Sequence, residues 1–160
     1  MELRKAQEIA ERVKSALASH CIRIEIAGSV RRGVDEVKDI EIVAIPKPYE
    51  IGLFESGIAT VVNQWPKIKG DLPCKYTQRV LPDGITLDLF FARKENWGLI
   101  YAIRTGSAEF SHKRLAARWV SQGYTSHQGM LMANGRAVPI LEEEDLFRRL
   151  SMDWVPPHDR

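Results

Sequence analysis

The chain has 160 residues, which is enough for one compact domain or for two small lobes. Hydrophobic residues make up 44% of it, and no apolar run approaches the length of a membrane-spanning helix, so we expect no membrane partner. A net charge of +2 excludes a histone-like protein that binds through its overall charge, although it leaves a local basic patch open.

The first part of the chain alternates between helix and strand patterns. Apolar residues recur at helical spacing over residues 3–19, which predicts an amphipathic helix. Residues 22–27 alternate apolar and charged side chains and predict a half-buried strand that runs into a turn at Gly28-Ser29. Further elements are expected as a strand over 37–45, a helix over 50–63, and two strands over 75–81 and 85–92 that are joined by Pro82-Asp83-Gly84. Together they predict a mixed sheet of four or five strands with helices on one face.

The pattern becomes mainly helical after residue 92. Helices are predicted over 96–104 and 108–122, followed by a hairpin of 128–133 and 136–140 about Asn134-Gly135, and by a helix that starts near Glu142 and ends before Pro156. We therefore expect an α+β protein with two domains, residues 1–93 and 94–160.

Three carboxylates mark the predicted sheet. Asp39 and Glu41 lie two residues apart on a strand, so they share one face while Ile40 and Ile42 point to the other. Asp88 stands alone in an apolar strand, where an acid is costly unless it is paired or bound to metal. If the two strands are neighbours, the three acids converge, and three oxygen donors suit Mg²⁺ or Mn²⁺. Taken singly, each acid has a simpler interpretation as a solvent-facing strand residue.

Two basic regions accompany these acids. The Gly28-Ser29 turn offers backbone N–H groups and a hydroxyl for phosphate oxygens, with Arg31 and Arg32 beside it, although a glycine turn with surface arginines would have the same sequence. A second cluster between residues 104 and 118 also fits a solvated helix face.

The order of these motifs resembles family X DNA polymerases, the polymerase beta-like nucleotidyltransferases. The palm of that family is matched by Gly28-Ser29-Val30-Arg31-Arg32-Gly33 with Asp39, Glu41 and Asp88. Its thumb and C-terminal signature are matched by Arg104-Thr105-Gly106-Ser107, by Glu144-Asp145-Leu146-Phe147 and by Pro156-Pro157-His158-Asp159-Arg160. The resemblance spans nearly the whole chain and implies a minimal palm-plus-thumb form, as in some viral or phage-like members. The palm would be a nucleotidyltransferase domain and the thumb a small α/β lobe.

The resemblance implies a template-directed DNA polymerase that fills gaps, adding dNMP to a primer 3′-hydroxyl and releasing pyrophosphate. Asp39 and Glu41 would bind two Mg²⁺ or Mn²⁺ ions, and Asp88 would bind the catalytic ion and accept the hydroxyl proton. The dNTP triphosphate would be bound by Gly28, Ser29, Arg32 and Lys38. DNA or nucleotide contacts from the thumb would come from Arg104, Thr105, Gly106, Ser107, His112, Lys113, Arg114 and Arg118.

Two other functions stay open. Glu41 stands where the polymerases usually have a second aspartate, and this favours a nucleotidyltransferase with a small-molecule, protein or RNA acceptor. A non-catalytic nucleotide- or DNA-binding module is the third candidate. For the polymerase we expect a monomer acting on gapped or primer-template DNA. Cys21 and Cys74 lack metal-ligand spacing and suggest reduced thiols in a cytoplasmic or other intracellular setting.

Overall fold

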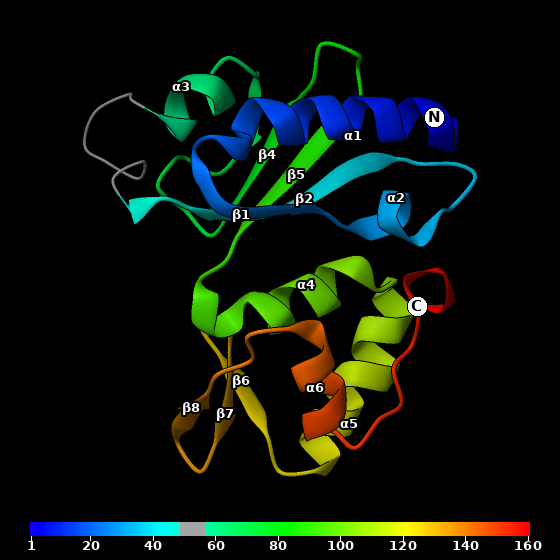
Figure 1. The fold of residues 1–160 in the computed structure, drawn as a ribbon, viewed down its shortest axis with the longest axis vertical. Coiled ribbons are helices and arrows are strands. Elements are labelled where there is room, and N and C mark those ends of the chain that lie inside the picture. The colour runs from blue at the N-terminus through cyan, green and yellow to red at the C-terminus, as the bar shows by residue number, and fades with distance from the viewer. Residues whose placement is uncertain (49–56) are drawn as a thin grey trace. The chain divides into compact units, whose positions relative to one another are not determined.

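The computed structural model describes residues 1–48 and 57–160, which fold as two units, Met1–Ala92 and Arg93–Arg160 (Figure 1). Both units combine helices with a β-sheet, so the chain is α+β, as expected from the sequence. The boundary between the units lies one residue before the expected one.

The first unit is built on a mixed five-stranded sheet with the order β1-β2-β5-β4-β3. Its strands are β1 Cys21–Ile26, β2 Asp39–Pro46, β3 Lys67–Lys69, β4 Tyr76–Val80 and β5 Thr86–Phe91. The pair β2 and β5 is parallel, whereas the other neighbours are antiparallel. Four of these strands were predicted from the sequence, whereas β3 was missed, because it has only three residues and all of them are exposed.

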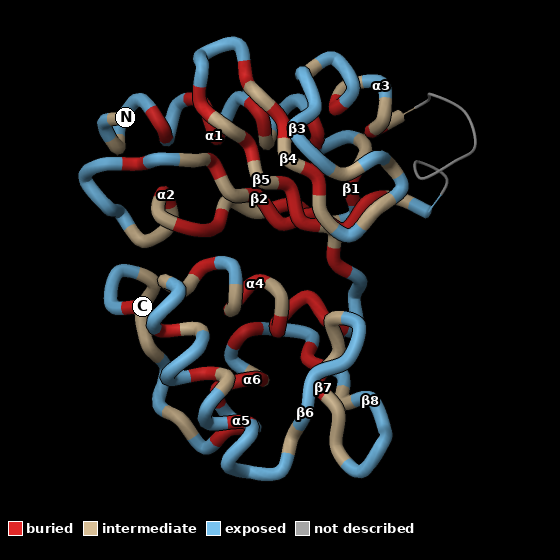
Figure 2. Tube along the Cα trace, turned by 180° about the vertical axis from the view of Figure 1, so that it is seen from behind, coloured by how far each residue is buried: buried red, intermediate tan, exposed pale blue. Residues whose placement is uncertain are grey.

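The core of this unit lies between the sheet and helix α1, Leu3–Ala18. The helix packs along one face of the sheet (Figure 1), and buried positions follow β2 and β5 through its middle (Figure 2). The apolar stripe of α1 meets alternate residues of the strands, and the packed side chains include Ile9, Val13, Leu17, Ile40, Ile42, Leu87 and Leu89. Since the core uses one set of alternate positions, the other set faces away from it.

Two predicted elements differ from the structure. The expected Gly28-Ser29 turn is the first turn of a short helix, α2 Gly28–Arg32, which ends at Gly33 in the left-handed conformation. Of the helix expected over 50–63, only α3 Ile58–Val62 is found among the described residues, and residues 50–56 lie outside them. Gly57 directly precedes α3 with φ of 65°, a backbone conformation that glycine adopts readily.

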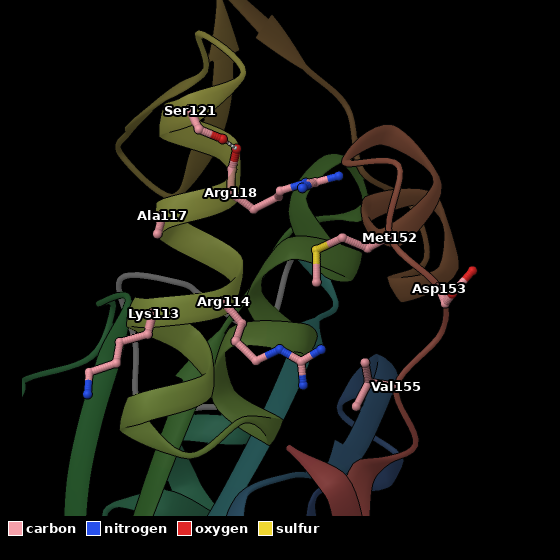
Figure 3. A pocket seen from close by; sticks show the side chains of 8 residues that line it. All are labelled: Lys113, Arg114, Ala117, Arg118, Ser121, Met152, Asp153 and Val155. Carbon is pink, nitrogen blue, oxygen red and sulfur yellow. Dashed lines mark hydrogen bonds between the residues drawn. The ribbon is translucent and has the colours of Figure 1, made fainter.

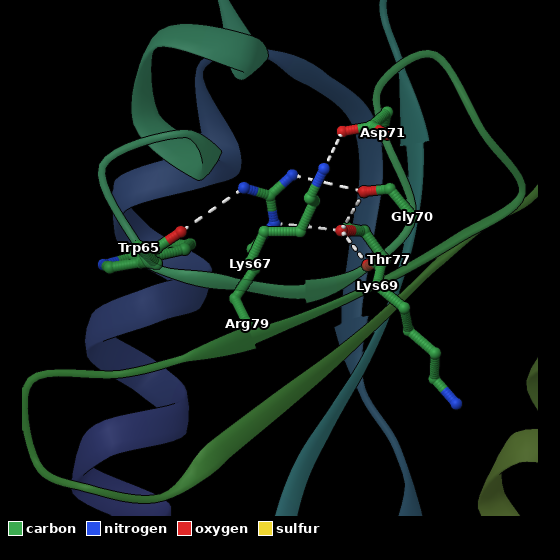
Figure 4. Close-up of polar contacts among 7 residues, drawn as sticks. All are labelled: Trp65, Lys67, Lys69, Gly70, Asp71, Thr77 and Arg79. Carbon is green, nitrogen blue, oxygen red and sulfur yellow. Dashed lines mark hydrogen bonds and ion pairs between the residues drawn. The ribbon is translucent and has the colours of Figure 1, made fainter.

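The buried side chain of Arg79, on β4, connects β4 to the segment around the edge strand β3. The Arg79 guanidinium donates hydrogen bonds to the Thr77 hydroxyl at 2.9 Å and to the carbonyls of Trp65 and Gly70, both at 3.3 Å (Figure 4). Burial is the largest cause that lowers the pKa of Arg79. These hydrogen bonds give the buried guanidinium its acceptors and hold the segment around β3 against β4. Arg79 therefore has a structural role.

The second unit combines six short helical elements with a small sheet. Its helical elements are the 3₁₀ turn η2 Lys94–Asn96, α4 Trp97–Thr105, the π-helix η3 Phe110–Ala116, α5 Ala117–Ser121, α6 Glu143–Arg149 and the 3₁₀ turn η4 Pro157–Asp159. The sheet has the order β6-β7-β8, formed by Thr125–His127, Met130–Ala133 and Arg136–Val138. The predicted hairpin is β7 and β8, whereas β6 was missed because its three polar residues are exposed.

The predicted helix over 108–122 has π geometry between Phe110 and Ala116, which a pattern of 3.6 residues per turn cannot reveal. The helix expected from Glu142 ends at Arg149, well before Pro156.

Arg160 fixes the end of the chain to the core of the second unit. Its guanidinium lies 5.0 Å from the Phe147 ring centroid and 4.6 Å from that of Trp154, and it pairs with the buried Glu143 carboxylate at 2.6 Å. Its backbone oxygen accepts a hydrogen bond of 3.3 Å from the Ser107 amide. The Pro-Pro-His-Asp-Arg signature therefore stabilises the turn that precedes η3.

Candidate functional site

The predicted acids lie on the face of the first sheet that α1 does not cover. In the parallel pair β2 and β5, Glu41 is the direct partner of Asp88, and Asp39 is the partner of Thr86. All three acids are half-buried, while the residues between them are buried in the core. The structure therefore places Asp39, Glu41 and Asp88 on one face, on adjacent strands, as the sequence analysis anticipated for neighbouring strands.

Asp39 is in an unfavourable environment for its charge. Its pKa is raised, first by burial and second by the nearby negative charge of Asp88, while Arg32 and Lys38 act in the opposite direction. The two predicted phosphate-binding cations are thus close enough to act on the predicted metal ligand. Two carboxylates that repel one another in a half-buried place favour a cation between them.

Gly28 leaves the space in which the Glu41 carboxylate lies. A Cβ atom at this glycine would come within 1.6 Å of Glu41 Oε2, and the residue has φ of +59°. Both the contact and the backbone angle require glycine. The absence of a side chain at Gly28, the first residue of α2, therefore leaves room for the Glu41 carboxylate of β2.

The Ser29 hydroxyl is buried and forms no hydrogen bond among the described residues. A buried hydroxyl without a partner costs about 1–3 kcal/mol, so it is a feature that a ligand could relieve. It lies directly after Gly28, at the position where the sequence predicted a phosphate contact.

Two residues that the sequence analysis missed hold Asp88. Tyr76 Oη donates a hydrogen bond of 2.7 Å, and Gln78 Nε2 one of 2.8 Å, and both end on Asp88 Oδ1. Gln78 is the direct partner of Asp88 across the antiparallel pair β4 and β5. Alternation along β4 places both donors on the face of Asp88, and this signal could have found them once the strand pairing was known.

The fit of a divalent cation depends on these carboxylates. In residues 1–48 and 57–160, no three His, Cys, Asp or Glu side chains are already gathered around one point. The donor chemistry nevertheless suits Mg²⁺ or Mn²⁺, since the three acids are oxygen ligands on two adjacent strands. The residues therefore fit such an ion in their donor chemistry and strand placement, and the metal site stays a prediction.

In the second unit, the predicted Thr105-Gly106-Ser107 motif has mainly structural contacts. Thr105 is fully buried, and the Ser107 hydroxyl accepts a hydrogen bond of 3.2 Å from the Phe110 amide. A Cβ atom at Gly106 would lie 2.6 Å from Ser111 Oγ and 2.8 Å from Phe110 Cδ1, so the turn requires glycine there. The expected DNA or nucleotide contacts of these residues stay predictions.

The basic residues that were predicted between positions 104 and 118 fall into two groups. Arg118 donates hydrogen bonds to the carbonyls of Leu150 at 3.0 Å and Ser151 at 3.2 Å, so it fastens α5 to the end of α6. The other cations, Arg104, His112, Lys113 and Arg114, are exposed.

Arg114 and Arg118 line an open pocket of about 530 Å³ beside Met152, Asp153 and Val155. In Figure 3 the Arg114 side chain extends toward Val155, whereas Lys113 points away from it. The second unit thus presents a basic helix surface, of which Arg118 is the anchored member.

Residues 100–160 match the family model for the DNA polymerase beta thumb. The match covers most of the second unit and supports a polymerase beta-like relationship, with DNA binding as the associated property. No curated protein matches the chain. Among the described residues, no helix is both long and apolar enough to cross a membrane.

Proposed function

We propose that this protein is a metal-dependent, template-directed DNA polymerase of the family X type that fills short gaps. The observation that carries the proposal is the thumb match over residues 100–160 in a chain whose other unit has three carboxylates on one sheet face, with Glu41 and Asp88 directly paired. A thumb match alone supports DNA binding, while the carboxylates add the donor set that nucleotidyl transfer needs.

In this proposal Asp39 and Glu41 hold two ions, Mg²⁺ or Mn²⁺, and Asp88 holds the catalytic one. When bound, these ions would lower the pKa of a primer 3′-hydroxyl and neutralise phosphate charge. The Ser29 hydroxyl and the Gly28 region would bind the dNTP triphosphate, with Arg32 and Lys38 supplying positive charge. Asp88 would accept the hydroxyl proton as the new bond to the α-phosphorus forms and pyrophosphate leaves.

The test is primer extension on DNA with a one-nucleotide gap, with each dNTP and rNTP supplied separately. We expect templated addition that requires Mg²⁺ or Mn²⁺, and an Asp88→Asn variant that loses at least about 100-fold in rate. Asp35→Asn is the matched control, because Asp35 is an exposed acid in the segment between α2 and β2.

Three results would count against the proposal. Full activity in Asp88→Asn would remove Asp88 from the reaction. Nucleotide transfer to an RNA end or a small molecule, without extension of gapped DNA, would instead favour the nucleotidyltransferase with another acceptor. An absence of metal-dependent turnover with every nucleotide would favour the binding module.

A further inference from the structure

Asp88 occupies the middle of a polar row that crosses three strands. Glu41 on β2 is its partner on one side, and Gln78 on β4 is its partner on the other. The hydrogen bonds from Tyr76 and Gln78 both reach Oδ1 of Asp88, at 2.7 Å and 2.8 Å. One oxygen of the carboxylate is therefore held from the β4 side.

The chemistry of these groups fixes the direction of both bonds. An ionised carboxylate only accepts hydrogen bonds, so the Gln78 amide must present its NH₂ group and Tyr76 its hydroxyl hydrogen. Two donors on one oxygen restrain the rotation of the carboxylate about its own axis. Because β5 lies between β4 and β2, Asp88 stands between its two donors on β4 and the acids Asp39 and Glu41 on β2.

Tyr76 is itself held in place. Its ring stacks on Phe90 with centroids 4.9 Å apart and an interplanar angle of 21°, and Lys69 Nζ lies 5.2 Å from the ring centroid. A donor whose ring is packed in this way has little freedom to leave its acceptor.

We propose that Tyr76 and Gln78 are positioning residues that orient the Asp88 carboxylate for a divalent cation. The inference rests on the metal site of the proposed function and extends it to two residues of β4. Hydrogen-bond partners of a metal-binding carboxylate commonly contribute 10–100-fold in metal affinity or activity. We expect about that loss when both donors are removed.

The experiment compares Tyr76→Phe, Gln78→Met and the double variant with wild type. Phenylalanine keeps the ring that stacks on Phe90, and methionine keeps the length of the glutamine side chain. Gln64→Met and Tyr124→Phe are matched controls, since they make the same chemical changes away from the acids. Circular dichroism melts identify any variant that fails to fold. If Gln78→Met fails to fold, the Tyr76→Phe variant still tests the inference.

The first readout is Mn²⁺ binding to the protein alone, measured from the electron paramagnetic resonance signal of free Mn²⁺. The double variant should bind Mn²⁺ about 10–100-fold more weakly, with each single variant between it and wild type. The second readout is primer extension, in which kcat should fall while KM for dNTP changes little, because the triphosphate contacts are intact. Unchanged Mn²⁺ affinity and kcat in the double variant would overturn the inference.

The two readouts separate this inference from the proposed function. Wild-type protein that binds Mn²⁺ and loses the ion in the double variant, without extending any primer, would support the positioning role and reject the polymerase. Wild-type protein that extends primers at a rate unaffected by the double substitution would support the polymerase and reject the positioning role.

Discussion

The two units use the residues that the sequence singled out in opposite ways. On the sheet face of the first unit, Asp39, Glu41 and Asp88 stay half-exposed and lie next to one another. In the second unit, Thr105 is buried in the core and Arg118 is bonded to backbone carbonyls. A polar residue on the uncovered face of a strand makes few contacts that stabilise the fold. A polar residue at a turn between helices readily forms hydrogen bonds with backbone N–H and C=O groups.

The largest expected effect on stability comes from breaking the buried Glu143–Arg160 ion pair of the second unit. Glu143→Gln leaves the buried Arg160 guanidinium without its charge partner, and breaking a buried pair typically costs about 3–5 kcal/mol. Urea unfolding followed by tryptophan fluorescence measures the loss, since Trp97, Trp119 and Trp154 lie in the second unit. Glu144→Gln, the exposed neighbour, should change stability by less than about 0.5 kcal/mol. Equal effects of the two substitutions would contradict the role of Arg160 as an anchor.

Two glycines of the first unit, Gly28 and Gly33, allow a matched test of the proposed metal site. Gly28→Ala and Gly33→Ala both place a side chain at positive φ, +59° and +73°, which costs about 1–2 kcal/mol in each case. Only the Gly28 substitution also displaces the Glu41 carboxylate, because nothing lies within 4 Å of a Cβ atom at Gly33. We expect Gly28→Ala alone to weaken Mn²⁺ binding and primer extension, and similar losses in both variants would remove Gly28 from the site.

The placement of the three acids on one sheet face was predictable because its signals are local and periodic. Asp39 and Glu41 two residues apart, and Asp88 between apolar residues, establish the shared face as soon as β2 and β5 are paired. The donors Tyr76 and Gln78 were not predictable from their own sequence, since they become partners of Asp88 only through the pairing of β4 with β5. Strand alternation gives the face of a residue, and strand order gives its neighbours.

The second unit was harder to predict because its turns are determined by contacts far along the chain. The burial of Arg160 against Phe147 and the hydrogen bond from the Ser107 amide depend on a tail more than 50 residues away from that turn. The π geometry of η3 likewise rotates its basic residues away from their places on an ideal helix. Motif similarity located the region that matches the thumb model, but it did not show which residues of that region pack in its core.

The basic helix gives a third way to sharpen the comparison. Arg118→Ala should lower the free energy of unfolding by about 1–2 kcal/mol, because two hydrogen bonds to the end of α6 are lost. Lys113→Ala and Arg114→Ala should change stability by no more than about 0.5 kcal/mol. In binding assays with gapped duplex, each of the latter two should reduce the slope of log affinity against log salt by about one. A reduced slope in Arg118→Ala alone would reverse the assignment of structural and contact residues.

The smallest expected effect is the dependence of stability on pH that Asp39 confers. Since burial and Asp88 raise the pKa of Asp39 in the folded state, the folded protein holds a proton there more tightly than the unfolded chain does. Stability from this group is therefore present below the unfolded pKa of about 4 and is lost as pH rises through the folded value.

Asp39→Asn removes the charge, so the variant should be more stable than wild type above that pH range, by about 0.2–1 kcal/mol, and should show no gain at lower pH. Thermal melts at pH 3.5 and pH 7 without divalent cations measure the difference. Added Mn²⁺ should reverse it, because the ion stabilises only the protein that keeps the carboxylate. A gain of equal size at both pH values would show that the Asp39 charge is not the cause, and that the sheet face holds its acids without electrostatic cost.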